Sequence, residues 1–218
     1  DCDPQGNASS GYGIDKSALE QTIYHVLIDG ADIREVIQHT EFKVDVLPAN
    51  IELAGAEVEL VAAISRETRL KKAIDQVAGD YDYVIIDCPP SLGLLTLNSL
   101  AAADSVLMPI QCEFYALEGV SQLMNTIDLV RNNLNDRLEV EGVVMTMYDS
   151  RTRLAEQVVA EVRENFGDAV YKTMIPRNVR LSEAPSHGKT ILSYAPLSAG
   201  AMAYQALAQE FLARAEAT

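Results

Sequence analysis

YVIIDCPP, residues 83–90, is the stretch that decides the fold class of this chain. Four apolar or aromatic residues precede Asp87, which is the pattern of a buried parallel strand that ends on a carboxylate. Pro89 and Pro90 lack amide donors, so they turn the chain away from the sheet, and Ser91 is then placed to cap the next helix. A carboxylate at such a strand end is a typical partner, through water, of a nucleotide-bound Mg²⁺.

The first seven residues, DCDPQGN, read as the tail of a similar strand and supply a second acid, Asp3. A carboxylate there is suited to orienting the attacking water in phosphoryl transfer. The residues alone favour a simpler interpretation, because Asp-Pro and Gly-Asn are ordinary turn formers. A phosphate site also needs a glycine-rich loop ending in Gly-Lys-Ser or Gly-Lys-Thr, which the 218 residues do not contain. The simplest interpretation is a chain that lacks its first strand, its phosphate loop and its first helix.

Strand-like and helix-like segments alternate along the rest of the sequence. Strands are predicted at 44–47, 82–87, 105–110, 140–147 and 170–175, and helices at 70–77, 94–103, 120–130, 154–162 and 204–211. This order predicts an α/β fold, a single domain with a doubly wound, mostly parallel sheet. Ligands of such sheets bind at the carboxyl ends of the strands, which here are Asp87 and the loops after Ile110, Met147 and Ile175.

The composition is that of an ordinary globular protein, with 48% apolar and 22% charged residues. No apolar run is long enough to span a bilayer and no signal peptide is visible, so we expect a cytoplasmic protein. The three cysteines and three histidines show no spacing typical of disulfide or metal sites. The net charge of −15 argues against nucleic acid, yet residues 151–189 carry seven basic and five acidic side chains. A local basic face is therefore possible on an acidic chain.

Four motifs together resemble the ParA/Soj family of chromosome-partitioning ATPases. They are DCDPQGN at 1–7, IDCPPSLG at 86–93, PIQCEFYALEG at 109–119 and IPRNVRLSEAPS at 175–186. They occur in the family's order and cover the chain from end to end. The resemblance implies one ParA-type nucleotide-binding domain over residues 1–218, of the deviant P-loop NTPase type, with the phosphate loop and its two lysines upstream of Asp1.

The resemblance also assigns roles to individual residues. Asp87 corresponds to the magnesium-site carboxylate and Asp3 to the acid that positions the hydrolytic water. Arg151 and Arg180 correspond to surface arginines that hold non-specific DNA, which strengthens the case for a basic face. Three further residues fall where the family's adenine pocket is walled, and we carry these over as nucleotide-binding candidates: Met147, Pro176 and Arg177.

The implied mechanism is a nucleotide switch. ATP and Mg²⁺ join two subunits face to face, and only this homodimer gathers enough arginines to hold DNA through its phosphates. A centromere-binding partner of the ParB/Spo0J type then stimulates hydrolysis, and the dimer separates and leaves the nucleoid. Without a phosphate loop, the 218 residues alone are expected to be inactive.

Three alternatives remain open from the sequence. A MinD-like, membrane-associated positioning ATPase shares the architecture but needs a basic amphipathic tail, whereas residues 205–216 hold one arginine and two glutamates. An iron–sulfur reductase needs paired thiolates, and Cys88 reads instead as a small core residue. A non-catalytic interaction module would explain the missing phosphate loop, but such a module has no physical reason to keep both Asp3 and Asp87.

Overall fold

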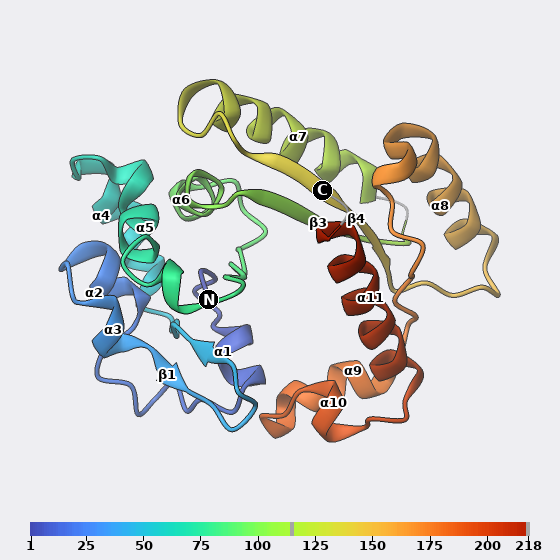
Figure 1. Ribbon diagram of the computed structural model, residues 1–218, viewed down its shortest axis with the longest axis horizontal. Helices are drawn as coiled ribbons and strands as arrows, with labels where there is room; N and C mark the ends of the chain where they lie inside the picture. Colours follow the sequence, from blue (N-terminus) through green and yellow to red (C-terminus); the bar gives the residue numbers. More distant parts are fainter. Residues whose placement is uncertain (114–115, 217–218) are drawn as a thin grey trace. The chain divides into compact units, whose positions relative to one another are not determined.

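The computed structural model describes residues 1–113 and 116–216 (Figure 1). These residues form two compact units. Unit 1 contains Asp1–Asp104, Thr126–Leu138 and Pro185–Lys189, and unit 2 contains Ser105–Asn125, Glu139–Ala184 and Thr190–Thr218. A single domain over 1–218 stays a prediction. No helix in the described part of the chain is both long and apolar enough to cross a membrane.

Unit 1 consists of short helices around an apolar core and one small antiparallel hairpin. The helices are α1 (Asn7–Gly11), α2 (Ile23–Ile28), α3 (Ile33–Val36), α4 (Leu53–Glu59), α5 (Arg69–Ile74) and α6 (Leu94–Ala102), with 3₁₀ turns at Leu60–Ala62, Arg66–Thr68 and Ala78–Asp80. The hairpin pairs β1 (Gln38–His39) with β2 (Asp45–Val46). One buried cluster of unit 1 brings together residues far apart in sequence, namely Cys2, Ile23, Leu27, Ala49, Leu53, Ala56, Leu60, Leu70 and Leu95.

Local periodicity predicted two helices of unit 1, α5 and α6, and did not predict α1 to α4. The helix expected at 94–103 is α6 and the one expected at 70–77 is the shorter α5, while the strand expected at 44–47 is β2. The capping prediction was wrong: Ser91 does not cap α6, whose N-cap residue is Gly93. The Glu57 carboxylate of α4 accepts the amides of Leu94 and Leu95 at 2.8 and 3.1 Å, so it supplies the missing acceptor from elsewhere in the fold.

The strand predicted at 82–87 is not formed among the described residues, so this prediction was wrong. Tyr83, Val84 and Ile85 are exposed by 52%, 47% and 90%, and Cys88 is exposed rather than part of a core. A run that is apolar on both faces predicts a buried strand only if neighbouring strands pair with it on both sides. This segment is joined to the first residues of the chain at Asp87, whose carbonyl accepts a hydrogen bond from the Cys2 amide at 2.8 Å.

Unit 2 contains the parallel pairing that the sequence predicts. β3 (Ser105–Gln111) pairs with β4 (Glu139–Thr146) in parallel, from Ser105 opposite Glu139 to Gln111 opposite Thr146, with a register shift after Val106. Its helices are α7 (Ala116–Asn133), which runs on into residues of unit 1, and α8 (Arg153–Phe166), α9 (Val179–Glu183), α10 (Ile191–Tyr194) and α11 (Ala199–Ala215). A short 3₁₀ turn lies at Gly167–Ala169, and another at Ala184–His187 begins in unit 2 and continues in residues of unit 1. The mixed α/β fold with a parallel sheet is confirmed.

The segment at 170–175 lies beside β4 in parallel, although it forms bridges rather than a regular strand. The Tyr171 amide donates to the Val143 carbonyl and the Ile175 amide donates to the Met145 carbonyl, both at 2.8 Å. β4 shows no alternation of burial through Val143, Val144 and Met145, as expected for a strand covered on both faces.

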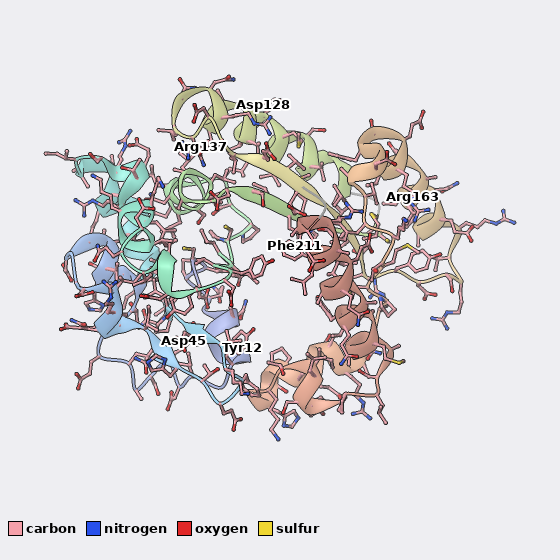
Figure 2. All side chains as sticks on the ribbon, in the orientation of Figure 1. Tyr12, Asp45, Asp128, Arg137, Arg163 and Phe211 are labelled. Carbon is pink, nitrogen blue, oxygen red and sulfur yellow. The ribbon has the colours of Figure 1, made fainter. Side chains whose placement is uncertain are left out.

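The last helix, α11, holds the segment at 170–175 in place within unit 2. Phe211 and Leu207 of α11 pack against the cluster of Val144, Tyr171 and Ile175. Figure 2 labels Phe211 on this helix. The Glu210 carboxylate accepts the amides of residues 172 and 173 at 2.8 and 2.9 Å. The Arg214 guanidinium lies 3.8 Å over the Tyr171 ring and donates to the carbonyls of residues 169 and 170. These contacts position the chain just before Pro176 and Arg177.

Candidate functional site

Asp3 and Asp87 lie close together in unit 1. The hydrogen bond from the Cys2 amide to the Asp87 carbonyl joins their two segments. The Asp87 side chain is exposed, yet desolvation of its carboxyl by nearby protein atoms raises its pKa, and the charge of Asp3 raises the pKa further. The two acids predicted from distant parts of the sequence therefore share one electrostatic environment.

Asp3 is held in the turn that its sequence predicts. Its Oδ1 accepts the Gln5 amide at 2.9 Å and its carbonyl accepts the Gly6 amide at 2.8 Å. Gly6 has a φ of 61°, and a Cβ built there would come within 2.5 Å of the Ala49 carbonyl oxygen. The turn thus depends on glycine at this position, and it fixes the direction from which Asp3 can meet a ligand.

Two contacts beside this turn escaped the sequence reasoning. Lys16 donates from Nζ to the Gln5 carbonyl at 2.6 Å, which places a positive charge next to the Asp3 turn. The Asp1 carboxylate accepts both the amide and the hydroxyl of buried Ser9 at 2.8 Å and so ties the turn to α1. An open depression of about 310 Å³ lies over the turn, lined by Pro4, Gln5, Lys16, Ser17, Asn50 and Ile51.

The acid pair fits a magnesium ion. Mg²⁺ prefers carboxylate and water oxygens, and a divalent cation would favour the ionised form of Asp87, whose pKa is raised first by desolvation and then by the charge of Asp3. The fit to the phosphates is only partial. Residues 1–113 and 116–216 do not include a glycine-rich loop ending in Gly-Lys-Ser or Gly-Lys-Thr whose amides would cradle them.

The candidate adenine-pocket residues meet at the carboxyl end of β4 in unit 2. The Tyr148 amide donates to the Ile175 carbonyl and the Arg177 amide donates to the Tyr148 carbonyl, both at 3.0 Å, so Met147 lies beside Pro176 and Arg177. Met147 has a φ of 54°, a left-handed conformation that is rare for a residue with a side chain. Backbone strain of this kind is concentrated at ligand sites.

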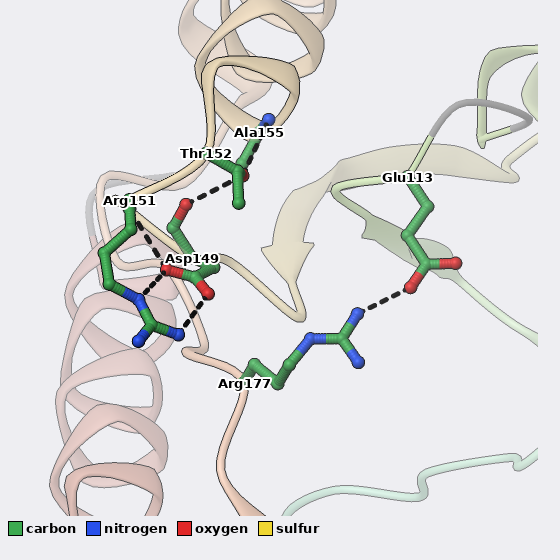
Figure 3. Close-up of polar contacts among 6 residues, drawn as sticks. All are labelled: Glu113, Asp149, Arg151, Thr152, Ala155 and Arg177. Carbon is green, nitrogen blue, oxygen red and sulfur yellow. Dashed lines mark hydrogen bonds and ion pairs between the residues drawn. The ribbon is translucent and has the colours of Figure 1, made fainter.

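The two arginines predicted to face DNA both carry intramolecular ion pairs. Arg151 donates from Nε and Nη2 to the two carboxylate oxygens of Asp149, at 2.9 and 2.7 Å (Figure 3). Arg180 donates to Glu183 Oε2 at 2.8 Å. Arg177, from the candidate adenine pocket, binds Glu113 Oε1 at 2.6 Å (Figure 3).

The same ion pairs set the local electrostatics. Hydrogen bonds from Arg151 hold the pKa of Asp149 well below its usual range, and the charge of Arg177 adds to this effect. Asp149 therefore stays ionised at any physiological pH. Sequence reasoning found the arginines but missed this carboxylate, although the spacing Asp-x-Arg after a strand was available as a signal.

Comparison with known proteins decides the family. A family profile described as "AAA domain" matches residues 1–140. The sporulation initiation inhibitor protein Soj of Bacillus subtilis is 60% identical over 214 residues, which are 98% of this chain and 85% of Soj. The chain belongs to the ParA/Soj family. The chromosome partitioning protein ParA of Myxococcus xanthus is 55% identical over 215 residues, which are 98% of this chain and 76% of that protein.

Solved structures agree with the ParA/Soj assignment at the level of fold. A crystal structure of cobyrinic acid a,c-diamide synthase from Mycobacterium smegmatis, with bound ADP and magnesium, superposes with a TM-score of 0.82. It is 38% identical and covers 95% of this chain and 78% of that protein. In this ParA/Soj chain, Asp3 and Asp87 lie together in unit 1, while Met147, Pro176 and Arg177 lie together in unit 2.

Proposed function

We propose that this ParA/Soj chain is part of an ATP- and Mg²⁺-dependent partitioning ATPase for a chromosome or plasmid. The observation that carries the proposal is the shared environment of Asp3 and Asp87, two acids from motifs far apart in sequence, in a chain 60% identical to Soj. Two acids from distant motifs are joined here through the hydrogen bond from the Cys2 amide to the Asp87 carbonyl, and paired carboxylates of this kind suit a magnesium site.

In the proposed site, Asp87 holds Mg²⁺ through water and Asp3 orients the water that attacks the terminal phosphate. The metal, when bound, neutralises charge on the phosphate oxygens. Asp3 is suited to its role because the Gln5 amide and the Gly6 turn fix the direction of its carboxylate. In unit 2, Met147, Pro176 and Arg177 are the proposed adenine-binding residues, and the strained backbone at Met147 supports their assignment.

The remaining steps depend on assembly. ATP joins two copies of the protein, and the dimer presents Arg151 and Arg180 of both copies to the phosphates of nucleoid DNA. A ParB/Spo0J-type centromere-binding protein stimulates hydrolysis and thereby releases the dimer from DNA. The exposure of both arginine side chains, 86% for Arg151 and 55% for Arg180, supports this assignment.

The test of the metal site is Asp87→Asn in the intact protein. We expect ATP with Mg²⁺ to stabilise the parent protein by about 2.7 kcal/mol at about 100 times the dissociation constant, because ligand binds only the folded state. The Asn variant should lose the part of this stabilisation that depends on Mg²⁺. Thermal unfolding with ATP plus Mg²⁺ and with ATP plus EDTA measures the difference, and Asp82→Asn is a control that removes a carboxylate from the same segment. An Mg²⁺ effect of unchanged size would contradict the proposal.

The same variant has a pH signature without any ligand. The pKa of Asp87 is raised in the folded state, so folding becomes less favourable as pH rises from the ordinary pKa of aspartate through the raised value. Near neutral pH this cost is fully present, and Asp87→Asn should therefore raise the free energy of unfolding. At pH values below the ordinary pKa of aspartate both forms are neutral and the difference should vanish. Urea unfolding of the parent and the variant across this pH range measures the change.

Arg180→Ala tests the DNA face. We expect it to weaken binding of the ATP-bound protein to DNA about tenfold, equally for unrelated sequences, since a charged hydrogen bond to phosphate is lost. The slope of log affinity against log salt should become shallower, by less than the value of about 1 for an unpaired arginine, because Arg180 is paired with Glu183. Filter binding across a salt series measures both quantities. Arg163→Ala, which removes an exposed arginine from α8, is the matched control, and ATP-driven dimerisation measured by sizing should be the same in all three proteins.

A further inference from the structure

The ion pair between Arg151 and Asp149 occupies the atoms through which Arg151 would hold DNA. Nε and Nη2 form two parallel hydrogen bonds to the carboxylate, which is the forked geometry that a phosphate would also use. We propose that Asp149 is an internal competitor of DNA phosphate, which holds the Arg151 guanidinium and thereby sets the DNA affinity of this face. The inference rests on the proposed DNA binding by Arg151.

Asp149 is built into the fold, whereas the Arg151 side chain extends into solvent. The Asp149 side chain is 20% exposed, against 86% for Arg151. Asp149 Oδ1 also accepts the Arg151 amide at 3.0 Å, and its carbonyl accepts the amide and hydroxyl of Thr152, both at 3.0 Å. The Thr152 hydroxyl in turn caps α8 by accepting the Ala155 amide at 3.3 Å (Figure 3). The carboxylate therefore stays in place when the guanidinium turns toward a phosphate.

The competition also changes the net number of counterions that are released when DNA binds. When Arg151 leaves Asp149 for a phosphate, the exposed carboxylate must attract a cation from solution. The release of a cation from the phosphate is thus largely offset by the uptake of one at Asp149. Arg151 therefore adds less to the salt dependence of DNA binding than an unpaired arginine would. Arg177 is the other positive group that acts on Asp149, but its guanidinium is bound to Glu113.

Arg180 has a similar arrangement in the neighbouring segment. Glu183 Oε2 accepts from Arg180 at 2.8 Å and from the Tyr194 hydroxyl at 3.2 Å. The segments that carry the two arginines are joined at Tyr148 and Pro176, at the same end of β4. Pairing with a carboxylate is thus shared by both arginines at this end of unit 2, and two parallel hydrogen bonds hold Arg151 to Asp149.

The experiment is Asp149→Asn in the intact protein with ATP and Mg²⁺, measured as binding to a random-sequence DNA duplex from about 0.05 to 0.2 M salt. The amide keeps an acceptor for the residue 151 amide but cannot form the ion pair. We expect affinity to rise about twofold to fivefold, the range of an exposed ion pair. The salt slope should steepen by about 0.9, one more released counterion. Glu164→Gln makes the same charge change on α8 and should change both the DNA affinity and the salt slope less than Asp149→Asn does.

A double variant decides whether the effect passes through Arg151. In an Arg151→Ala background, Asp149→Asn should add no more than Glu164→Gln does. If Asp149→Asn leaves affinity equal to the Glu164→Gln value, or lowers it, Asp149 is no competitor and the inference is overturned while DNA binding by Arg151 stands. If the parent protein binds no DNA with ATP, the proposed function and the inference fail together. Circular dichroism checks folding, and Asp149→Ser, whose hydroxyl can keep the local turn, repeats the test if the Asn variant unfolds.

Discussion

ATP hydrolysis by an Asp3→Asn variant of the intact protein is expected to fall by about 10²–10⁴-fold, the usual contribution of a positioned acid–base group. The amide keeps the acceptor that binds the Gln5 amide at 2.9 Å, so the turn should persist. It cannot accept a proton or a strong hydrogen bond from the attacking water. ATP-dependent dimerisation should survive, because Asp87 and the adenine-pocket residues are unchanged.

Single-turnover release of phosphate measures this effect apart from product release. Asp15→Asn is the matched control, since Asp15 also accepts hydrogen bonds within a turn, from the amide and hydroxyl of Ser17. Hydrolysis by Asp3→Asn within about tenfold of the parent would contradict the assigned role. Loss of both hydrolysis and dimerisation would instead mean that Asp3 supports the fold or nucleotide binding rather than the chemical step.

Tyr171→Ala should destabilise unit 2 by about 3–5 kcal/mol, the range for removing a large buried aromatic side chain. Tyr171 is fully buried, its ring lies under the Arg214 guanidinium, and its edge fills the space above Gly142, where even a methyl group would come within 2.6 Å of the ring. Removing the ring leaves a cavity and releases α11 from the segment before Pro176 and Arg177. Nucleotide affinity should therefore decrease along with stability.

Urea unfolding followed by circular dichroism provides the measurement. Tyr171→Phe is the control, because it removes only the hydrogen bond from the hydroxyl to Glu141 at 2.9 Å and should cost about 1 kcal/mol. The raised pKa of Tyr171, caused first by burial and then by Glu141, agrees with a hydroxyl that stays protonated and donates. Equal effects of Ala and Phe would show that the ring itself contributes little.

Local periodicity predicted those elements in which the segment's own apolar residues correctly indicate which side chains are buried. The helix α6 and the parallel pair of β3 and β4 follow directly from apolar spacing and from the lack of alternation. The segment at 82–87 has an equally clear pattern and still forms no strand among the described residues. Its burial depends on partners along both edges, which the pattern of a single segment cannot supply.

The candidate site shows the same division. The turn that holds Asp3 could be predicted from its local residues. Asp87 was predicted at the end of a strand that does not form, and the roles of both acids, which come from the family resemblance, stay predictions. The contacts of Lys16 and Glu57 could not be predicted, because they reach across 11 and 37 residues and no short sequence pattern indicates them. The pairing of Asp149 with Arg151 could be predicted, because the two residues are only two positions apart after a strand. Long-range contacts of this kind are fixed by tertiary packing alone.

The fastening of residues 169–173 by Glu210 and Arg214 has a consequence for synthesis on the ribosome. A nascent chain that has emerged only as far as α10 already contains β3, β4 and the candidate adenine-pocket residues, but not the acceptors and donors that secure them. This part of the chain should then bind nucleotide only after the final helix has been synthesised, so a chain that ends before α11 should not bind it.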